Sequence, residues 1–114
     1  VAVKLMADGV AADPAHRERF RREARAAAAL AHPNVVKALD WAEDAAGRPY
    51  LVMEYVDGET LADRVRRDGP LPVEAACRVV AQAAAGLQAA HAAGLVHRDV
   101  KPDNLLVDAA GTVK

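Results

Sequence analysis

The sequence has few of the residues that cross-link or fill a small fold. It contains one cysteine, Cys77, one tryptophan, one phenylalanine and two tyrosines among 114 residues. A single cysteine excludes an internal disulfide framework and a multi-cysteine zinc site, and it is typical of a reducing compartment. Alanine accounts for 28 residues. Because alanine favours helix but buries little surface, we expect helices around a thin core.

The chain also lacks a surplus of charge of either sign and a long apolar run. It has 15 basic and 16 acidic residues, for a net charge of −1. Electrostatic binding to nucleic acid requires a basic surplus, so we expect no nucleic-acid partner. No apolar run approaches the ~20 residues that cross a bilayer, and no signal-peptide pattern opens the chain. We therefore expect no membrane contact by this segment.

The order of apolar runs and breakers predicts an α+β arrangement. Both ends of the sequence look cut, because Val1 begins inside an apolar run without an initiator methionine and Lys114 follows a strand-like Thr-Val pair. We therefore expect a piece of a longer protein. We expect strands at 1–6, 35–41, 49–56, 105–107 and 112–113, helices at 14–31, 60–67 and 72–93, and a loop at 7–12.

Local signals predict where the helices begin and which faces they bury. Asp13 before Pro14 is a typical N-cap, and Thr60 is a second capping residue. The helical period of the longest helix predicts one buried stripe, and Cys77 beside it is expected to be a small buried hydrophobe. The stripe consists of Ala76, Val79, Val80, Ala83 and Leu87.

The segment that carries chemistry is the polar run His-Arg-Asp-Val-Lys-Pro-Asp-Asn at 97–104. Apolar residues precede and follow it, so both of its ends are expected to be held in a core, which lets a loop present rigid side chains. Asp99 and Asn104 could bracket a divalent cation and a hydroxyl, and Lys101 could offset phosphate charge. On the residues alone, phosphate handling and an inert solvated loop are equally good interpretations.

This run resembles the catalytic loop of eukaryotic-like serine/threonine protein kinases. Three further motifs resemble other parts of that family in the same order: the strand Val-Ala-Val-Lys at 1–4, the helix and following strand at 20–36, and the hinge Met-Glu-Tyr-Val at 53–56. The resemblance implies part of a two-lobe protein kinase fold. It assigns 1–56 to the N-lobe with its helix, and 57–114 to the hinge exit, helices and catalytic loop of the C-lobe.

The resemblance implies that Lys4 holds the α- and β-phosphates of ATP and that Glu23 pairs with Lys4. The residue pattern supports the pair, because Glu23 falls on an apolar helical stripe with Phe20 and Ala27. A carboxylate there is costly without a partner, and Lys4 interrupts an apolar strand in the same way. The alternative is two exposed charges that do not interact.

The resemblance also assigns roles in the catalytic loop. Asp99 would accept or orient the proton of the substrate hydroxyl. Asn104 would bind Mg²⁺, and Lys101 would contact the γ-phosphate. A lysine at this position is typical of the serine/threonine branch of the family.

A third set of residues would form the nucleotide pocket. Ala2 would lie in its roof and Leu106 in its floor, with Met53 at the back, and the backbone of Glu54 and Val56 would hydrogen-bond the adenine. Either Glu59 or Asp57 would reach the ribose. Taken alone, each of Ala2, Met53 and Leu106 is better interpreted as an ordinary core residue.

The resemblance implies that the parent protein transfers the γ-phosphoryl of ATP to Ser or Thr hydroxyls of a protein substrate, with Mg²⁺. No Gly-rich phosphate loop and no Asp-Phe-Gly motif lies within the sequence, so the segment alone is expected to be inactive. The expected location is the cytoplasm, with or without a membrane anchor elsewhere in the parent. The alternatives are a pseudokinase or binding scaffold of kinase fold, and a small-molecule phosphotransferase.

Overall fold

The computed structural model describes residues 1–5 and 13–114, and the loop expected at 7–12 lies outside them. The chain divides into two compact units, which are described here separately. The first contains Val1–Ala31 and Lys37–Tyr55, and the second contains His32–Val36 and Val56–Lys114. The short segment His32–Val36 thus belongs to the second unit, although the rest of that unit begins at Val56.

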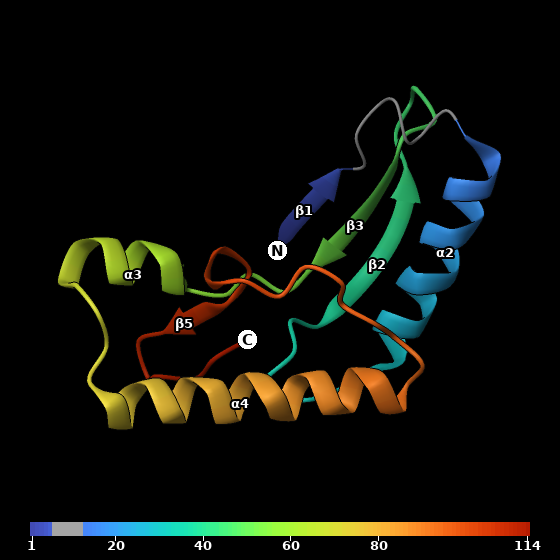
Figure 1. Ribbon diagram of the computed structural model, residues 1–114. Coiled ribbons are helices and arrows are strands. Elements are labelled where there is room, and N and C mark those ends of the chain that lie inside the picture. Colours follow the sequence, from blue (N-terminus) through green and yellow to red (C-terminus); the bar gives the residue numbers. More distant parts are fainter. Residues whose placement is uncertain (6–12) are drawn as a thin grey trace. The chain divides into compact units, whose positions relative to one another are not determined.

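The first unit is an antiparallel sheet with one helix beside it (Figure 1). The sheet has the order β1-β3-β2, and the hairpin expected from the Gly47 turn is confirmed, since β2 pairs with β3. Pro49, which has no N–H to donate, opens β3 as expected and is fully buried. The elements are β1 (Ala2–Leu5), α2 (Pro14–Ala29), β2 (Ala38–Glu43) and β3 (Pro49–Met53).

Helix α2 begins where the sequence predicts and contacts β2. The side chain of Asp13 accepts a hydrogen bond of 2.9 Å from the backbone N–H of Ala15, which caps the first turn. Ala24 of α2 and Ala38 of β2 are the buried hydrophobic residues of this unit among those described. Their small side chains give the thin core that the alanine content predicts.

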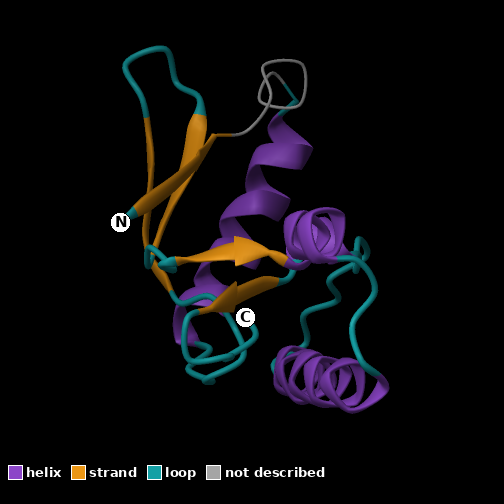
Figure 2. Cartoon of the chain, turned by 90° about the vertical axis from the view of Figure 1, so that its left-hand side faces the viewer, coloured by secondary structure: helices purple, strands orange, loops and turns teal. Residues whose placement is uncertain are grey.

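The second unit contains two helices and a short two-stranded sheet (Figures 1 and 2). Thr60 caps α3 by accepting from the backbone N–H of Asp63 at 3.0 Å, as expected. Gly94 follows α4 with a φ of +77°, which suits a residue without Cβ. The elements are β4 (Gly58–Thr60), α3 (Leu61–Asp68), α4 (Val73–Ala92), a 3₁₀ turn (Pro102–Asn104) and β5 (Leu106–Asp108).

Strand β4 is a difference from the prediction, which treated Asp57-Gly58 only as a break. Gly58 pairs with Asp108 and Thr60 with Leu106 in an antiparallel ladder. A Cβ on Gly58 would lie 2.4 Å from the Val107 carbonyl oxygen. Glycine is therefore needed here for the close approach of two backbones, not only for a turn.

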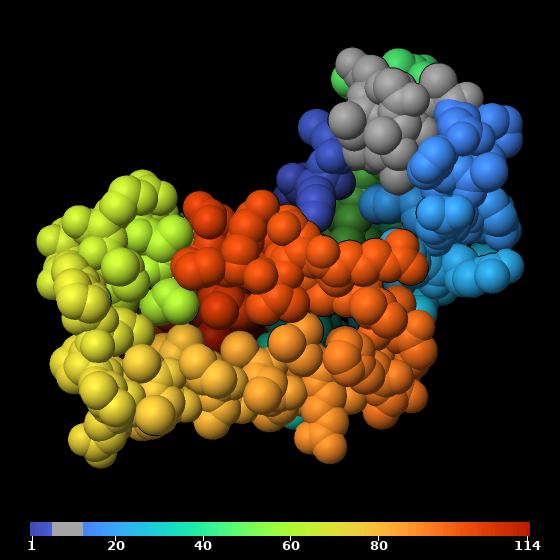
Figure 3. All heavy atoms as spheres, viewed as in Figure 1, coloured from blue at the N-terminus to red at the C-terminus, as the bar shows by residue number. Residues whose placement is uncertain are grey.

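The predicted buried face of α4 is partly wrong. Val80 is 66% exposed and Cys77 is exposed, because nothing in the described part of the chain packs on that side of the helix. Figure 3 shows the length of α4 uncovered on the face in view. The core instead consists of Leu61, Val107 and Val113, with Leu71, Val79 and Leu105 partly buried against them. No helix of the described residues has the length and apolar character to cross a membrane.

Candidate active site

The polar run at 97–104 forms a loop whose two ends are fixed by regular structure. It follows the C-terminal turn of α4 and ends in the 3₁₀ turn, where the backbone N–H of Asn104 donates to the Lys101 carbonyl at 2.9 Å. Arg98 has a φ of +64°, a left-handed conformation that is uncommon for a residue with a side chain. Such backbone strain gathers at functional sites.

Three of the predicted site residues lie together in this loop. The Nζ of Lys101 is 3.0 Å from Oδ2 of Asp99. The side-chain amide of Asn104 donates to the same Oδ2 at 2.9 Å and to the backbone carbonyl of Asp99 at 2.8 Å. The backbone N–H of Asp99 in turn donates to Nδ1 of His97 at 3.3 Å. Asp99 is thus held from its side chain and from its backbone.

These contacts hold the Asp99 carboxylate in its charged form. The hydrogen bond from Lys101, and then that from Asn104, lower the pKa of Asp99 below its usual value. The same contact raises the pKa of Lys101. All three side chains are exposed. Because both partners bind Oδ2, the other carboxylate oxygen, Oδ1, is left without a hydrogen bond within the described residues.

Asn104 fits the role of a magnesium ligand. Its Nδ2 makes both hydrogen bonds to Asp99, which leaves the amide oxygen to coordinate a cation. Mg²⁺ prefers oxygen ligands and usually takes one or two from the protein, with the rest from phosphates and water. No group of three or more His, Cys, Asp or Glu side chains that could hold a metal occurs in the described residues.

In the first unit the expected ion pair between Lys4 and Glu23 is not formed. Both side chains are exposed, and no ion pair joins them in this part of the described structure. The sequence argument assumed a carboxylate on a buried stripe that needed a partner. Because Glu23 lies in solvent, burial does not require that partner, and the two roles stay predictions.

Two residues of the expected nucleotide pocket are neighbours in the sheet of the first unit. Ala2 of β1 pairs with Met53 of β3 in the antiparallel register, and both are half-buried. Glu54 follows Met53, and its backbone N–H donates to the Lys37 carbonyl at 2.9 Å while its carboxylate accepts from the Lys37 N–H at 2.8 Å. These bonds fix the backbone of the expected hinge.

The remaining pocket residues belong to the second unit. Val56 and Leu106 are half-buried, and Leu106 lies in β5, directly after the catalytic loop. Glu59 already has a partner, because Arg67 binds both of its carboxylate oxygens. A ribose hydroxyl would therefore have to compete with Arg67 for Glu59, whereas Asp57 is exposed.

Sequence reasoning missed a group of hydrogen-bonded side chains outside the loop at 97–104. Asn34 and Gln82 join the turn at Gly111 and the buried Val113 through side-chain hydrogen bonds. Asn34 was part of a recognised motif, but its partner is 48 residues away in the sequence. The helical period of the sequence predicted that neighbours of Gln82 are buried, but it did not indicate that the Gln82 amide forms hydrogen bonds.

The comparisons with known proteins identify the class of protein that this fold and this loop define. The model of the protein kinase domain family matches residues 1–114. The chain belongs to the protein kinase domain family, and the expected α+β kinase fold is confirmed.

Its relatives are bacterial serine/threonine kinases. The chain is 50% identical to serine/threonine-protein kinase PknB of Mycobacterium leprae over 117 residues, which cover 100% of this chain and 19% of the relative. It is 42% identical to serine/threonine-protein kinase PksC of Streptomyces coelicolor, covering 22% of that protein. The crystal structure of the Mycobacterium tuberculosis PknI kinase domain matches with a TM-score of 0.88 and 34% identity, over 97% of this chain and 46% of that one. The chain thus spans about a fifth of these curated relatives.

Proposed function

We propose that this chain is the central part of the catalytic domain of a serine/threonine protein kinase. The parent protein would transfer the γ-phosphoryl group of ATP to a Ser or Thr hydroxyl of a protein substrate. The observation that carries the proposal is the arrangement of Asp99, Lys101 and Asn104, which combines a charged carboxylate, a cation and an amide oxygen in one exposed loop. The similarity to named serine/threonine kinases supports the choice of hydroxyl.

Asp99 acts on the substrate hydroxyl. Its Oδ1 accepts the hydroxyl proton as the new oxygen–phosphorus bond forms and the bond to the leaving ADP breaks. Lys101 and Asn104 bind Oδ2 and so direct Oδ1 toward the hydroxyl. The lowered pKa of Asp99 keeps the carboxylate ionised before the transfer.

Positively charged groups would neutralise the phosphates of ATP. The amide oxygen of Asn104 would hold Mg²⁺, which when bound would offset the charge that develops on the transferred group. Lys101 contacts the γ-phosphate while it stays bound to Asp99, because its ammonium group has three donors. Lys4 binds the α- and β-phosphates, and Glu23 moves into contact with Lys4 when the nucleotide is held.

Ala2, Met53 and Leu106 enclose the adenine, and the backbone of Glu54 and Val56 hydrogen-bonds its edge. Glu59 or Asp57 holds the ribose.

Because the reaction consumes ATP, we propose a cytoplasmic location for this domain, whether or not the parent has a membrane anchor. The 114-residue segment alone is proposed to be inactive.

The test is phosphoryl transfer by the complete protein that carries this segment, measured with γ-labelled ATP and a protein substrate. We expect Asp99→Asn to lower kcat by a factor of about 10²–10⁴, the usual contribution of a positioned base. The matched control is Asp103→Asn, an exposed aspartate in the same loop, which should keep kcat within about twofold. An Asp99→Asn variant with more than about a hundredth of normal turnover contradicts the proposal.

A further inference from the structure

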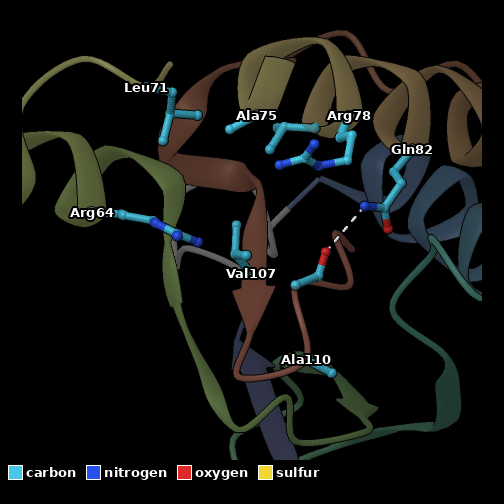
Figure 4. Close-up of a pocket in the computed structure, with 9 residues that line it drawn as sticks. Arg64, Leu71, Ala75, Arg78, Gln82, Val107 and Ala110 are labelled. Carbon is cyan, nitrogen blue, oxygen red and sulfur yellow. Dashed lines mark hydrogen bonds between the residues drawn. The ribbon is translucent and has the colours of Figure 1, made fainter. Parts of the chain in front are cut away.

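Three hydrogen bonds converge on the side chain of Gln82, outside the catalytic loop, and a fourth joins Asn34 to the same strand. Its Oε1 accepts from the Asn34 side-chain amide at 3.0 Å and from the backbone N–H of Val113 at 3.0 Å. Its Nε2 donates to the Gly111 carbonyl at 3.0 Å, the dashed line in Figure 4. The amide of Asn34 also donates to the Val113 carbonyl at 2.8 Å. We refer to Asn34, Gln82 and these four bonds as the amide clamp.

The amide clamp needs an amide at position 82 and a group that donates two hydrogen bonds at position 34. Gln82 uses an acceptor and a donor at once, which neither a carboxylate nor an apolar side chain can do. The site is half-buried, so each lost bond leaves a shielded polar group without a partner, which costs about 1–3 kcal/mol. The backbones also approach closely here, because a Cβ on Gly86 of the same helix would lie 2.3 Å from the Asn34 carbonyl oxygen.

The strand that the amide clamp holds is bonded to the end of the catalytic loop. Val113 is fully buried. The next residue, Lys114, exchanges two backbone hydrogen bonds of 2.8 Å with Leu106, and Leu106 is two residues after Asn104. The intervening turn is closed by Asp108, whose carboxylate accepts from the backbone N–H groups of Ala110 and Thr112. A short, fully hydrogen-bonded hairpin therefore connects the amide clamp with Asn104.

We propose that Asn34 and Gln82 are positioning residues, which fix Asn104 against Asp99 by holding this hairpin. The proposal rests on the proposed function for its effect on Mg²⁺. It has a second consequence that does not depend on activity, because the Asn104 amide contributes one of the hydrogen bonds to the Asp99 carboxylate.

The experiment compares three variants of the complete kinase. Gln82→Leu removes the three bonds of the amide clamp that involve Gln82. Asn34→Ala removes the amide that donates to Gln82 and to the Val113 carbonyl, and it leaves the bonds of Gln82 to Gly111 and Val113. Gln88→Leu is the matched control, since Gln88 is an exposed glutamine on the same helix. The readouts are the Mg²⁺ concentration for half-maximal phosphoryl transfer and the hydrogen-exchange rate of the Asn104 side-chain amide, measured by NMR without metal or nucleotide.

We expect Gln82→Leu and Asn34→Ala to raise the half-maximal Mg²⁺ concentration about tenfold, the lower end of the effect of residues that orient metal ligands. We also expect them to speed hydrogen exchange of the Asn104 side-chain amide about tenfold, because that amide is then held less firmly against Asp99, whereas Gln88→Leu changes neither readout. Variants that only lower the melting temperature, with the Asn104 amide exchanging as in the normal protein, would overturn the proposal. If exchange of the Asn104 amide is faster but no variant or parent transfers phosphate, the positioning role stands and the proposed function fails. If Gln82→Leu does not fold, Asn34→Ala decides.

Discussion

Replacing Gly86 with alanine tests how tightly the second unit is packed. Gly86 is the buried residue of α4. An alanine Cβ there would lie 2.3 Å from the Asn34 carbonyl oxygen, 3.1 Å from its carbonyl carbon and 3.3 Å from its Cβ. Real carbon and oxygen atoms do not approach to 2.3 Å, and the obstacle is backbone, so the segment at Asn34 must move away from α4.

Two effects of opposite sign set the magnitude. Glycine inside a helix costs about 1 kcal/mol relative to alanine, so the substitution gains that amount from helix propensity. Overpacking a well-packed site costs about 1–3 kcal/mol, and a backbone obstacle makes the upper value appropriate. The balance is a loss of about 2 kcal/mol in the free energy of unfolding.

The assay is urea denaturation of the complete kinase domain, with Ala84→Gly as the control. Ala84 is exposed on the same helix, so that variant measures helix propensity alone and should lose about 1 kcal/mol. If Gly86→Ala is as stable as the normal protein, or more stable, the close contact between α4 and Asn34 is not real, and the amide clamp loses its support.

The remaining predictions concern charge and capping. Lys101→Met should raise the pKa of Asp99, because the hydrogen bond from Lys101 is the largest cause of its lowering; NMR titration of the carboxyl checks this, and an unchanged pKa contradicts the pairing. Backbone N–H groups, chiefly that of Thr112, lower the pKa of Asp108, so its charged form stabilises the fold above the unfolded pKa. That stability is lost as pH falls through the folded pKa, and Asp108→Asn should flatten the acid side of a stability–pH profile. Thr60→Ala should cost about 1 kcal/mol in thermal unfolding by removing the cap of α3, whereas Thr60→Ser should cost little.

The sequence predicted what depends on neighbours in the chain. Asp13 and Thr60 cap their helices through N–H groups two or three residues away, and the catalytic loop groups Asp99 with residues two and five positions later. Such contacts follow from local geometry, so a short pattern is enough to find them.

Features that depend on distant partners were missed or remain predictions. Strand β4 exists because Gly58 meets Asp108, fifty residues later in the chain, and no local pattern marks that pairing. The exposure of Val80 depends on which element packs on α4. The Lys4–Glu23 pair was implied by the family resemblance and supported by an expected burial of Glu23; because Glu23 is exposed, the pair remains a prediction from the resemblance.

The central claim is that Asn104 binds the metal ion beside the Asp99 carboxylate, and the side-chain amide signals of Asn104 report on it most directly. The measurement is the NMR spectrum of the complete, labelled kinase domain with ATP, in which Mn²⁺ replaces Mg²⁺. We expect paramagnetic Mn²⁺ to broaden the Asn104 amide signals beyond detection and Mg²⁺ to leave them visible. Bound Mn²⁺ and ATP with sharp Asn104 signals would contradict it.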